Sequence, residues 1–263
     1  MAAGRPARLA RMGLRIERIT TLADNYTYLV ACEETGEAAI IDAPEAAPVI
    51  ERVEALGCDV TKVLSTHHHA DHSGANPELA KRYDAPVFGH TSEAQRIPGF
   101  TDGLDEGDRL CVGKQVARVL FVPAHTRGHV AYLFDDAGAL FCGDTLFAAG
   151  CGRIFEGTPE MMYTALCEKF AALPDATQVF CGNEYTESNL AFAAHVEPDN
   201  EAVRTKVARV RAARAKATAD WHDATAAEMT VPSTIGEERE TNPFLRAANA
   251  AELGRLRALK DSF

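Results

Sequence analysis

Three consecutive histidines, an aspartate and a fourth histidine stand together in the run THHHADH, directly after the short apolar run VTKVLS. An apolar run of this length is typical of a buried strand, so the histidines lie where that strand ends. Side chains alternate along a strand, so His67 and His69 point the same way while His68 points elsewhere. Asp71 and His72 fall in the following turn and helix start. The run therefore offers two ligand pairs, His67/His69 and Asp71/His72, to one cavity.

The run offers more potential ligands than one metal ion with an open position requires. Zn²⁺ and Fe²⁺ take three or four nitrogen or oxygen ligands and keep a position open for chemistry. Two further strand-like runs end in polar residues: VARVLFV precedes His125 in PAHTRGH, and ALF precedes Asp144 in CGDT. Asp144 can bridge two ions through its two oxygens. We therefore predict a site for two divalent metal ions, in preference to a polar loop with chance histidines. His129 is interpreted as a supporting or packing residue.

The rest of the first half alternates strands with helical patterns, which favours an α/β layered core. YTYLVAC and EAAIID are typical of a hairpin, and APEAAPVIERVEALG predicts a helix that stops at Gly57. After about residue 185 the patterns are helical. We therefore predict an N-terminal extension (1–13), a catalytic domain (14–184) and a helical domain (185–263).

Composition restricts the partners and the compartment. The net charge of −11 over 263 residues argues against broad nucleic-acid binding. The sequence has no run of about 18 apolar residues, so no membrane span is expected. Seven cysteines without a CxxC pair suit a reduced compartment. We expect a cytoplasmic monomer; the basic start MAAGRPARLARM is a dispensable segment or, alternatively, a weak organellar presequence.

The motifs THHHADH, PAHTRGH and GDT at these intervals resemble the metallo-β-lactamase superfamily. The runs GDTLFAAGCGRIFEGT, CGNEYTESNLAFAAHVEPDN, TVPSTIGEE, NPFLR and LRALKDSF are similar to glyoxalase II, the hydroxyacylglutathione hydrolase family. The resemblance covers the chain from about residue 14 and includes the helical tail. It implies an αβ/βα four-layer sandwich followed by a smaller, all-helical domain.

The resemblance also implies roles for individual residues. His67, His69 and His125 would hold one ion, while Asp71, His72 and the histidine of a CGHEYT motif would hold the other. Asp144 and a hydroxide would bridge the ions, which would be Zn²⁺, with Fe²⁺ or Mn²⁺ as alternatives. Five residues would bind the glutathione portion of the substrate: Arg153, Phe155, Tyr185, Arg257 and Lys260. The last two are three apart, so they share a helix face and can meet carboxylates of one ligand.

Two positions depart from the family pattern. The CGHEYT motif is CGNEYT in this chain, so Asn183 stands where the family has a histidine ligand. A neutral amide oxygen is a poorer ligand for Zn²⁺ than imidazole, so we expect a weakened, partly occupied second site that favours harder ions. Phe155 replaces the usual tyrosine and lacks its hydroxyl, which typically removes about 1 kcal/mol of hydrogen bonding.

The activity implied is hydrolysis of an S-(2-hydroxyacyl)glutathione thioester, S-D-lactoylglutathione for the usual family substrate. Hydroxide generated at the metals would attack the carbonyl, with Asp71 orienting it and Asp144 bridging the ions. This would be the second step of methylglyoxal detoxification. Two alternatives stay open: a glutathione-persulfide dioxygenase with one iron, and a binding protein for glutathione conjugates with an impaired centre.

Overall fold

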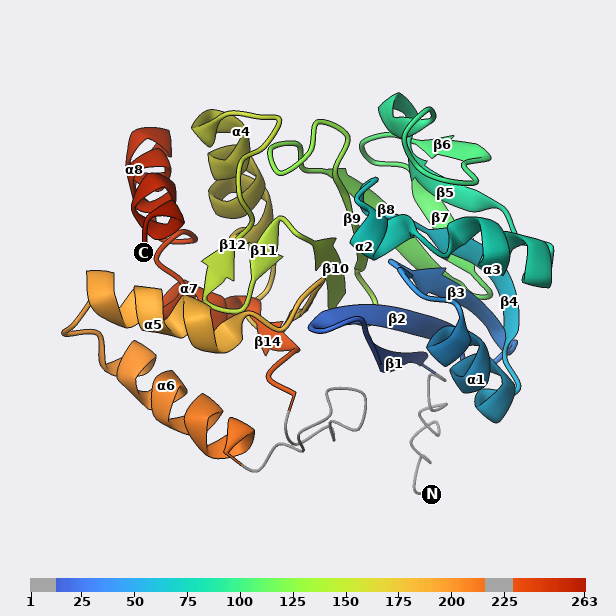
Figure 1. Cartoon of the computed structure of the whole chain (residues 1–263), viewed down its shortest axis with the longest axis horizontal. Coiled ribbons are helices and arrows are strands. Elements are labelled where there is room, and N and C mark those ends of the chain that lie inside the picture. Colours follow the sequence, from blue (N-terminus) through green and yellow to red (C-terminus); the bar gives the residue numbers. More distant parts are fainter. Residues whose placement is uncertain (1–12, 216–228) are drawn as a thin grey trace, which may run out of the picture.

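Two six-stranded sheets face each other in the computed structural model, which describes residues 13–215 and 229–263 (Figure 1). The first sheet keeps its strands in chain order: β1 (Leu14–Thr21), β2 (Asn25–Cys32), β3 (Glu37–Ile41), β4 (Asp59–Leu64), β5 (Val87–His90) and β6 (Asp102–Leu104). β1, β2 and β3 are antiparallel neighbours, whereas β3 to β6 are parallel. The predicted hairpin is confirmed as β2 and β3, with Tyr28 opposite Ile41.

The second sheet has the spatial order β14, β13, β10, β9, β8, β7. Its strands are β7 (Arg109–Val112), β8 (Gln115–Phe121), β9 (Val130–Phe134), β10 (Ala139–Gly143), β13 (Gln178–Cys181) and β14 (Ser233–Thr234). β14 comes from the C-terminal part of the chain and pairs antiparallel with β13. A separate small hairpin consists of β11 (Leu146–Phe147) and β12 (Gly150–Cys151).

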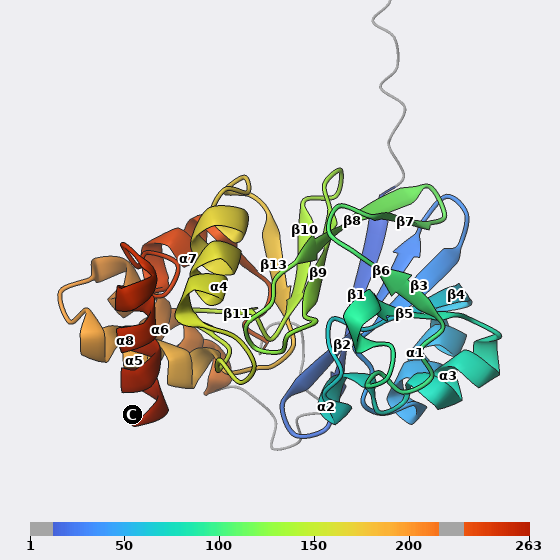
Figure 2. The same ribbon diagram turned by 90° about the horizontal axis from the view of Figure 1, so that it is seen from above.

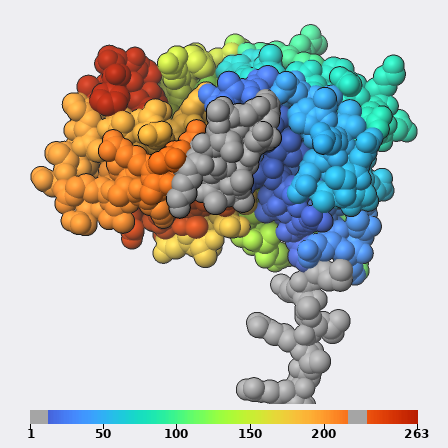
Figure 3. Space-filling model, turned by 60° about the horizontal axis from the view of Figure 1, so that its bottom comes forward, coloured from blue at the N-terminus to red at the C-terminus, as the bar shows by residue number. Residues whose placement is uncertain are grey.

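Helices flank the pair of sheets on both sides (Figure 2). On one side are α1 (Ala47–Leu56) and α3 (Asn76–Tyr83), with the short α2 (Ala70–Ser73) and the 3-10 helix η1 (Thr91–Glu93) in nearby loops. On the other are α4 (Pro159–Tyr163), the π-helix η2 (Thr164–Phe170), α5 (Thr186–Val196), α6 (Glu201–Arg214), α7 (Ile235–Thr241) and α8 (Ala250–Asp261). The predicted four-layer sandwich with a helical C-terminal part is confirmed. From below, α5 and α6 (orange) and the blue surface of β1, β2 and α1 form opposite ends (Figure 3).

Strand β2 shows how the sequence builds this layering. Tyr26, Tyr28 and Val30 belong to the core between the sheets, while Leu29 and Ala31 belong to the core that packs against α1 and α3. Because side chains alternate along a strand, a continuous apolar run buries both of its faces. Strand β2 is therefore buried on both faces along its whole length.

Helix α1 ends as predicted, because Gly57 adopts the left-handed conformation that closes a helix (φ 63°). Between β13 and α5 lies the proposed domain boundary near residue 184, which stays a prediction. The predicted N-terminal extension lies, apart from residue 13, outside the described residues. Among residues 13–215 and 229–263, no helix combines the length and apolarity needed to cross a bilayer.

Candidate metal centre

Loops that follow three strands bring the predicted metal ligands together. His67 and His69 follow β4, and His69 directly precedes α2, which contains Asp71 and His72. His125 lies in the loop after β8, and Asp144 comes immediately after β10. β4 belongs to the first sheet, and β8 and β10 belong to the second. The centre therefore forms only when the two sheets pack face to face.

The first group consists of His67, His69 and His125. Their ring nitrogens converge: His69 Nδ1 lies 3.0 Å from His67 Nε2 and 3.2 Å from His125 Nε2. One nitrogen from each ring lies within 4.8 Å of the others. His125 follows His69 by 56 residues in the sequence, yet the three rings meet at one point.

In His67 and His125, the nitrogen on the outer side of the ring has a partner that fixes the tautomer. His125 Nδ1 donates to the backbone oxygen of Arg153 over 2.9 Å. The Thr66 hydroxyl donates to Asp42, so it accepts from His67 Nδ1 over 3.1 Å. The inner nitrogens of His67 and His125 therefore carry lone pairs. Lone pairs that face one another repel, and a cation placed between them removes this repulsion.

Asp144 stands between the first group and the second. Its Oδ2 lies 3.5 Å from His125 Nε2, while its Oδ1 lies 3.2 Å from His72 Nε2. Asp71 Oδ2 lies 3.5 Å from the same nitrogen of His72. One carboxylate thus contacts ligands of both groups through different oxygens, which is the geometry expected of a bridging ligand.

Asp42, which the sequence analysis did not single out, orients His72. Its carboxylate accepts hydrogen bonds from the backbone N–H and the hydroxyl of Thr66, and its Oδ2 lies 3.1 Å from His72 Nδ1. These contacts turn His72 Nε2 toward Asp71 and Asp144. Asp42 follows β3 at a positive φ of 53°, which aspartate tolerates better than most residues. The only sequence signal was an Asp at the end of EAAIID, which any turn can supply.

The electrostatics suit a bound cation. Burial, followed by the nearby His72, holds the pKa of His67 well below its usual range. Burial and then His125 lower the pKa of His69 to about 4. Burial alone would raise the pKa of Asp144, but the charge of His72 brings it below the ordinary value. At neutral pH His67 and His69 are therefore neutral beside an ionised Asp144, which is the state in which these groups bind metals. Burial alone would lower the pKa of His72, but Asp144 raises it well above its usual range, so this ring has to release a proton when it binds an ion.

Buried polar atoms without hydrogen-bond partners test whether a metal fits. Among the described residues, Asn183 Oδ1 is buried without a hydrogen bond, and His72 Nε2 and Asp144 Oδ1 are buried and lack a well-aligned one, although they lie 3.2 Å from each other. Such atoms are costly unless something satisfies them. Imidazole nitrogens with carboxylate oxygens are the donor set of zinc and iron sites. The residues present therefore fit divalent metal ions.

Asn183 is buried in the loop after β13, and the structure shows which way its amide faces. Its Nδ2 donates to Asp24 Oδ1 over 3.1 Å, and its Oδ1 is the buried oxygen without a partner. The neighbouring Gly182 approaches the second group closely, since a Cβ there would lie 2.6 Å from Asp144 Oδ1. Whether Asn183 is a ligand stays a prediction.

His129 packs against the first group of histidines and supports Asp144. Its ring stacks on that of His67, with centroids 4.8 Å apart. Its Nε2 accepts a hydrogen bond from the backbone N–H of Asp144 over 3.1 Å. Because that nitrogen is occupied and the ring is fully buried, its geometry is that of a packing and supporting residue.

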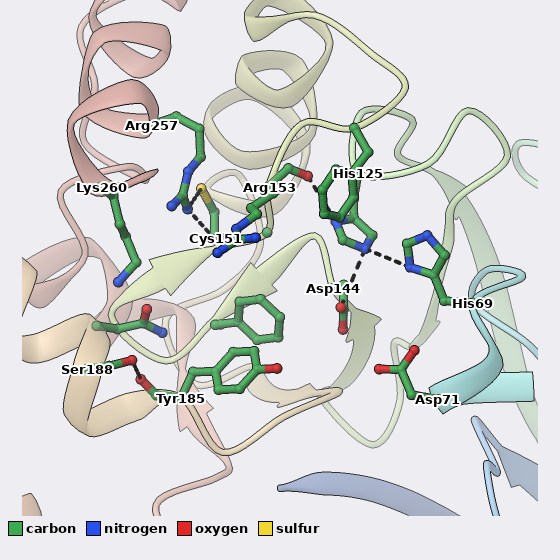
Figure 4. A pocket seen from close by; sticks show the side chains of 14 residues that line it. His69, Asp71, His125, Asp144, Cys151, Arg153, Tyr185, Ser188, Arg257 and Lys260 are labelled. Carbon is green, nitrogen blue, oxygen red and sulfur yellow. Dashed lines mark hydrogen bonds and ion pairs between the residues drawn. The ribbon is translucent and has the colours of Figure 1, made fainter. Parts of the chain in front are cut away.

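A cavity of about 490 Å³ opens from the metal centre toward α8 (Figure 4). His69, Asp71, His125 and Asp144 lie at one end, while Arg257 and Lys260 lie on the helix at the other. Three more of the predicted substrate residues line it: Arg153, Phe155 and Tyr185. The wall also contains residues that the sequence analysis did not assign: Phe147, Cys151, Gly152, Ser188 and Asn189.

The two cations on α8 are in different states. Arg257 is only 6% exposed, and its guanidinium is engaged by the backbone oxygen of Cys151 and by Asp261. Lys260 makes no ion pair among the residues described, although its Nζ lies 5.3 Å above the ring of Phe192. Burial, and then the charge of Arg257, lower the pKa of Lys260 to about 8. Lys260 is thus the cation more available to a ligand.

Two family matches cover nearly all of the chain. Residues 21–182 match the metallo-β-lactamase superfamily, and residues 184–263 match the C-terminal region of hydroxyacylglutathione hydrolases. The first match contains the candidate metal residues up to Asp144. The second begins at Glu184, next to Asn183, and contains Tyr185 and α8. The cavity is therefore lined by residues from both matched regions.

Individual relatives match over most of their length. A protein of Rhodospirillum rubrum named hydroxyacylglutathione hydrolase is 46% identical, with 90% of this chain and 88% of that protein covered. The one of the same name from Methylococcus capsulatus is 47% identical, with 89% and 87% covered. Among solved structures, ETHE1 from Myxococcus xanthus has a TM-score of 0.68 at 26% identity, covering 94% of this chain and 90% of that one. BLEG-1 B3 metallo-β-lactamase, at 22% identity and a TM-score of 0.64, shares the fold and covers 88% and 100%.

Proposed function

The chain belongs to the metallo-β-lactamase superfamily and, within it, to the hydroxyacylglutathione hydrolases, and we propose that it hydrolyses S-(2-hydroxyacyl)glutathione thioesters. With S-D-lactoylglutathione the products would be glutathione and D-lactate. One observation carries the proposal: a single cavity has a metal-ligand cluster at one end and two cations of α8 at the other (Figure 4). An acyl group at the first end and peptide carboxylates at the second would place the thioester bond between them.

The proposed metal ligands form two sets. His67, His69 and His125 would hold one ion, Asp71, His72 and Asn183 the other, and Asp144 would contact both. A divalent cation held by these residues would lower the pKa of a bound water and draw charge from the substrate carbonyl. We propose zinc for the first set, because its ligands are three imidazoles, and zinc, iron or manganese for the second, which has more oxygen ligands.

The chain's own residues would orient the reactants. Asp71 lines the cavity, and Asn25 Nδ2 donates to its backbone oxygen over 3.0 Å, with its Oδ2 3.3 Å from the same group. A carboxylate held in this way can accept a hydrogen bond from the attacking water and direct its lone pair at the carbonyl carbon. The leaving group is a thiolate, whose conjugate acid has a pKa of about 8.5 in free cysteine, so no protein acid has to protonate it.

Substrate capture would depend on local positive charge in an acidic protein. The chain has a net charge of −11, yet Arg153, Arg257 and Lys260 line the same cavity. Clustered cations in a concave site attract an anion despite an opposite overall charge. Phe155 and Tyr185 are 58% and 38% exposed, so they offer apolar surface to the backbone of the bound tripeptide.

The test is an assay on S-D-lactoylglutathione, combined with elemental analysis of the metal content. We expect thioester loss in the wild-type protein, and loss of both metal and activity in His69→Ala. Oxygen uptake with glutathione persulfide, without thioester hydrolysis, would indicate a dioxygenase instead. Binding of S-methylglutathione without turnover of either substrate would indicate a binding protein.

A further inference from the structure

His68, the middle histidine of the run, points away from the metal centre, and both of its ring nitrogens have neighbours. Arg96 Nη2 lies 2.6 Å from His68 Nε2, and Glu93 Oε2 lies 2.9 Å from Nδ1. A guanidinium can only donate, so Nε2 accepts and Nδ1 carries the proton opposite the carboxylate. The ring therefore has no nitrogen left for a metal. It connects the ligand-bearing segment to Arg96 on its outer side.

Glu93 fixes Arg96 in this place. Its side chain is fully buried, and its Oε1 accepts from Arg96 Nη1 over 3.2 Å. A buried carboxylate is costly without a cation, so the two residues stay together. The backbone of the His125 segment packs directly on the same carboxylate, because a Cβ at Gly128 would lie 2.2 Å from Glu93 Cγ. Arg96 is thus held against both segments that supply the first group of histidines.

The opposite edge of Arg96 binds Glu156. Nη1 donates to Glu156 Oε2 over 2.9 Å, and Nη2 donates to Oε1, so the pair is bidentate. The backbone N–H of Arg127 also donates to Glu156 Oε2, over 2.9 Å. Glu156 adjoins Phe155 and lies three residues after Arg153, and both of these residues line the cavity. One guanidinium therefore joins the two histidine segments to the loop proposed to bind glutathione.

Phe155 closes a ring of contacts around the first group of histidines. Its ring centroid lies 5.1 Å from that of His125 and 6.0 Å from that of His69. From His68 the contacts pass through Arg96 and Glu156 to Phe155 and return to His69. A shift of Glu156 would move Phe155 off the ligand rings and change the wall of the cavity.

We propose that Arg96 and Glu156 are positioning residues that hold the 152–156 loop over the metal centre and thereby set the affinity for glutathione. Neither residue lines the cavity, so they act through Phe155 and Arg153. The identity of the ligand rests on the proposed function, whereas the anchoring of the loop does not. The proposal concerns substrate affinity, so it predicts a larger change in KM than in kcat.

The first test compares Glu156→Gln with a matched control. Glutamine keeps the size of the side chain but cannot form a bidentate ion pair. The control is Asp135→Asn. Asp135, which follows β9, forms a bidentate ion pair with Arg118 on β8, and neither residue lines the cavity. We expect Glu156→Gln to raise KM for S-D-lactoylglutathione about tenfold, with a smaller change in kcat and an unchanged metal content. The control should keep wild-type constants. Equal KM values in the two variants would overturn the proposal.

The second test is hydrogen exchange of the protein without substrate, which does not depend on its activity. Backbone amides of residues 152–157 should exchange faster in Glu156→Gln than in wild type or Asp135→Asn. Arg96→Lys keeps the positive charge but loses the planar guanidinium that binds Glu156 bidentately, so the same amides should also exchange faster in this variant. Unchanged exchange in both variants would overturn the anchoring, even in a protein that proved inactive on thioesters. Faster exchange with an unchanged KM would overturn its role in substrate affinity.

Discussion

The guanidinium of Arg257 donates a hydrogen bond over 2.8 Å to the backbone oxygen of Cys151, which precedes it by 106 residues. Cys151 ends the small hairpin β11–β12, and Arg257 lies in α8, so this bond ties the last helix to the wall of the cavity. The same guanidinium donates to Asp261 over 2.9 Å. Arg257 therefore holds the cavity together, whereas Lys260 is available to a ligand.

These two cations should respond differently to removal. Lys260→Ala should raise KM for glutathione thioesters with little change in thermal stability. Arg257→Ala should raise KM and also destabilise the protein, by roughly 1–3 kcal/mol, because the Cys151 carbonyl is left without its partner in a buried position. Steady-state kinetics and thermal unfolding measure the two effects. The effect of Lys260→Ala on KM should shrink in high salt, which screens a charge that solvent reaches. Wild-type KM values in both variants at low salt would mean that α8 does not bind the substrate.

The lowered pKa of Lys260, about 8, predicts a pH dependence of substrate affinity. Below pH 8 the ammonium is charged and attracts carboxylates, and above it the charge is lost. KM should therefore rise with pH above 8, by at most about tenfold per unit because one proton is involved. The same shift makes the fold favour the neutral amine, so this group adds stability as pH rises from about 8 toward its unfolded value. In Lys260→Arg the rise in KM should disappear; a rise that persists would assign it to another group.

Asp42 should control the second metal without being its ligand. Asp42→Asn keeps the size of the side chain and tolerates the positive φ, but its amide would face His72 Nδ1 with N–H groups. We expect the affinity for the second ion to fall roughly ten- to hundredfold, as is typical when the partner of a ligating histidine is lost. Competition with a chelator measures this affinity. An unchanged affinity, in a variant that folds normally, would show that His72 needs no orienting carboxylate.

The buried ion pair between Lys206 and Glu238 should contribute strongly to the stability of the protein. Lys206 Nζ lies 2.8 Å from Glu238 Oε1, and both side chains are almost completely buried. Glu238 Oε2 in turn accepts from the backbone N–H of Ala149, in the turn of the β11–β12 hairpin. Lys206→Met should destabilise the protein by about 3–5 kcal/mol, because it leaves an uncompensated buried charge. Denaturant unfolding measures this loss. Adding Glu238→Gln should recover part of it; a single variant that loses less than about 1 kcal/mol would contradict the prediction.

The sequence predicted the parts of this molecule that local patterns determine. Apolar runs followed by His67, His125 and Asp144 predicted strands that end at candidate ligands; the strands are found, and the three side chains converge. Contacts between residues of common types that lie far apart in the sequence could not be predicted from local patterns. Asp42 looks like any turn residue, yet it contacts a histidine 30 positions later. Arg96 and Glu156 are 60 residues apart, and only the packed loops bring them together.

The orientation of the Asn183 amide could not be predicted from the sequence either, because the hydrogen bond that it donates to Asp24 joins residues 159 positions apart. With Nδ2 held in this way, Oδ1 is the atom left to serve a metal, and an amide oxygen binds Zn²⁺ less tightly than imidazole does. Asp71 and His72 would then depend on a weak third donor. The second site should consequently fill only when the concentration of free metal is high.

Asn183→His should raise occupancy of the second site and raise kcat for thioester hydrolysis. Each tenfold gain in rate corresponds to about 1.4 kcal/mol, and a metal ion that activates water and withdraws charge from the carbonyl can supply several such steps. Added Mn²⁺ or Zn²⁺ should partly restore the rate of the present chain through mass action on the weak site, and should do little for the histidine variant. A metal titration of both proteins, with rates measured at each point, separates the outcomes. Equal stoichiometry, equal rates and no response to added metal would show that Asn183 is an adequate ligand or does not reach the metals.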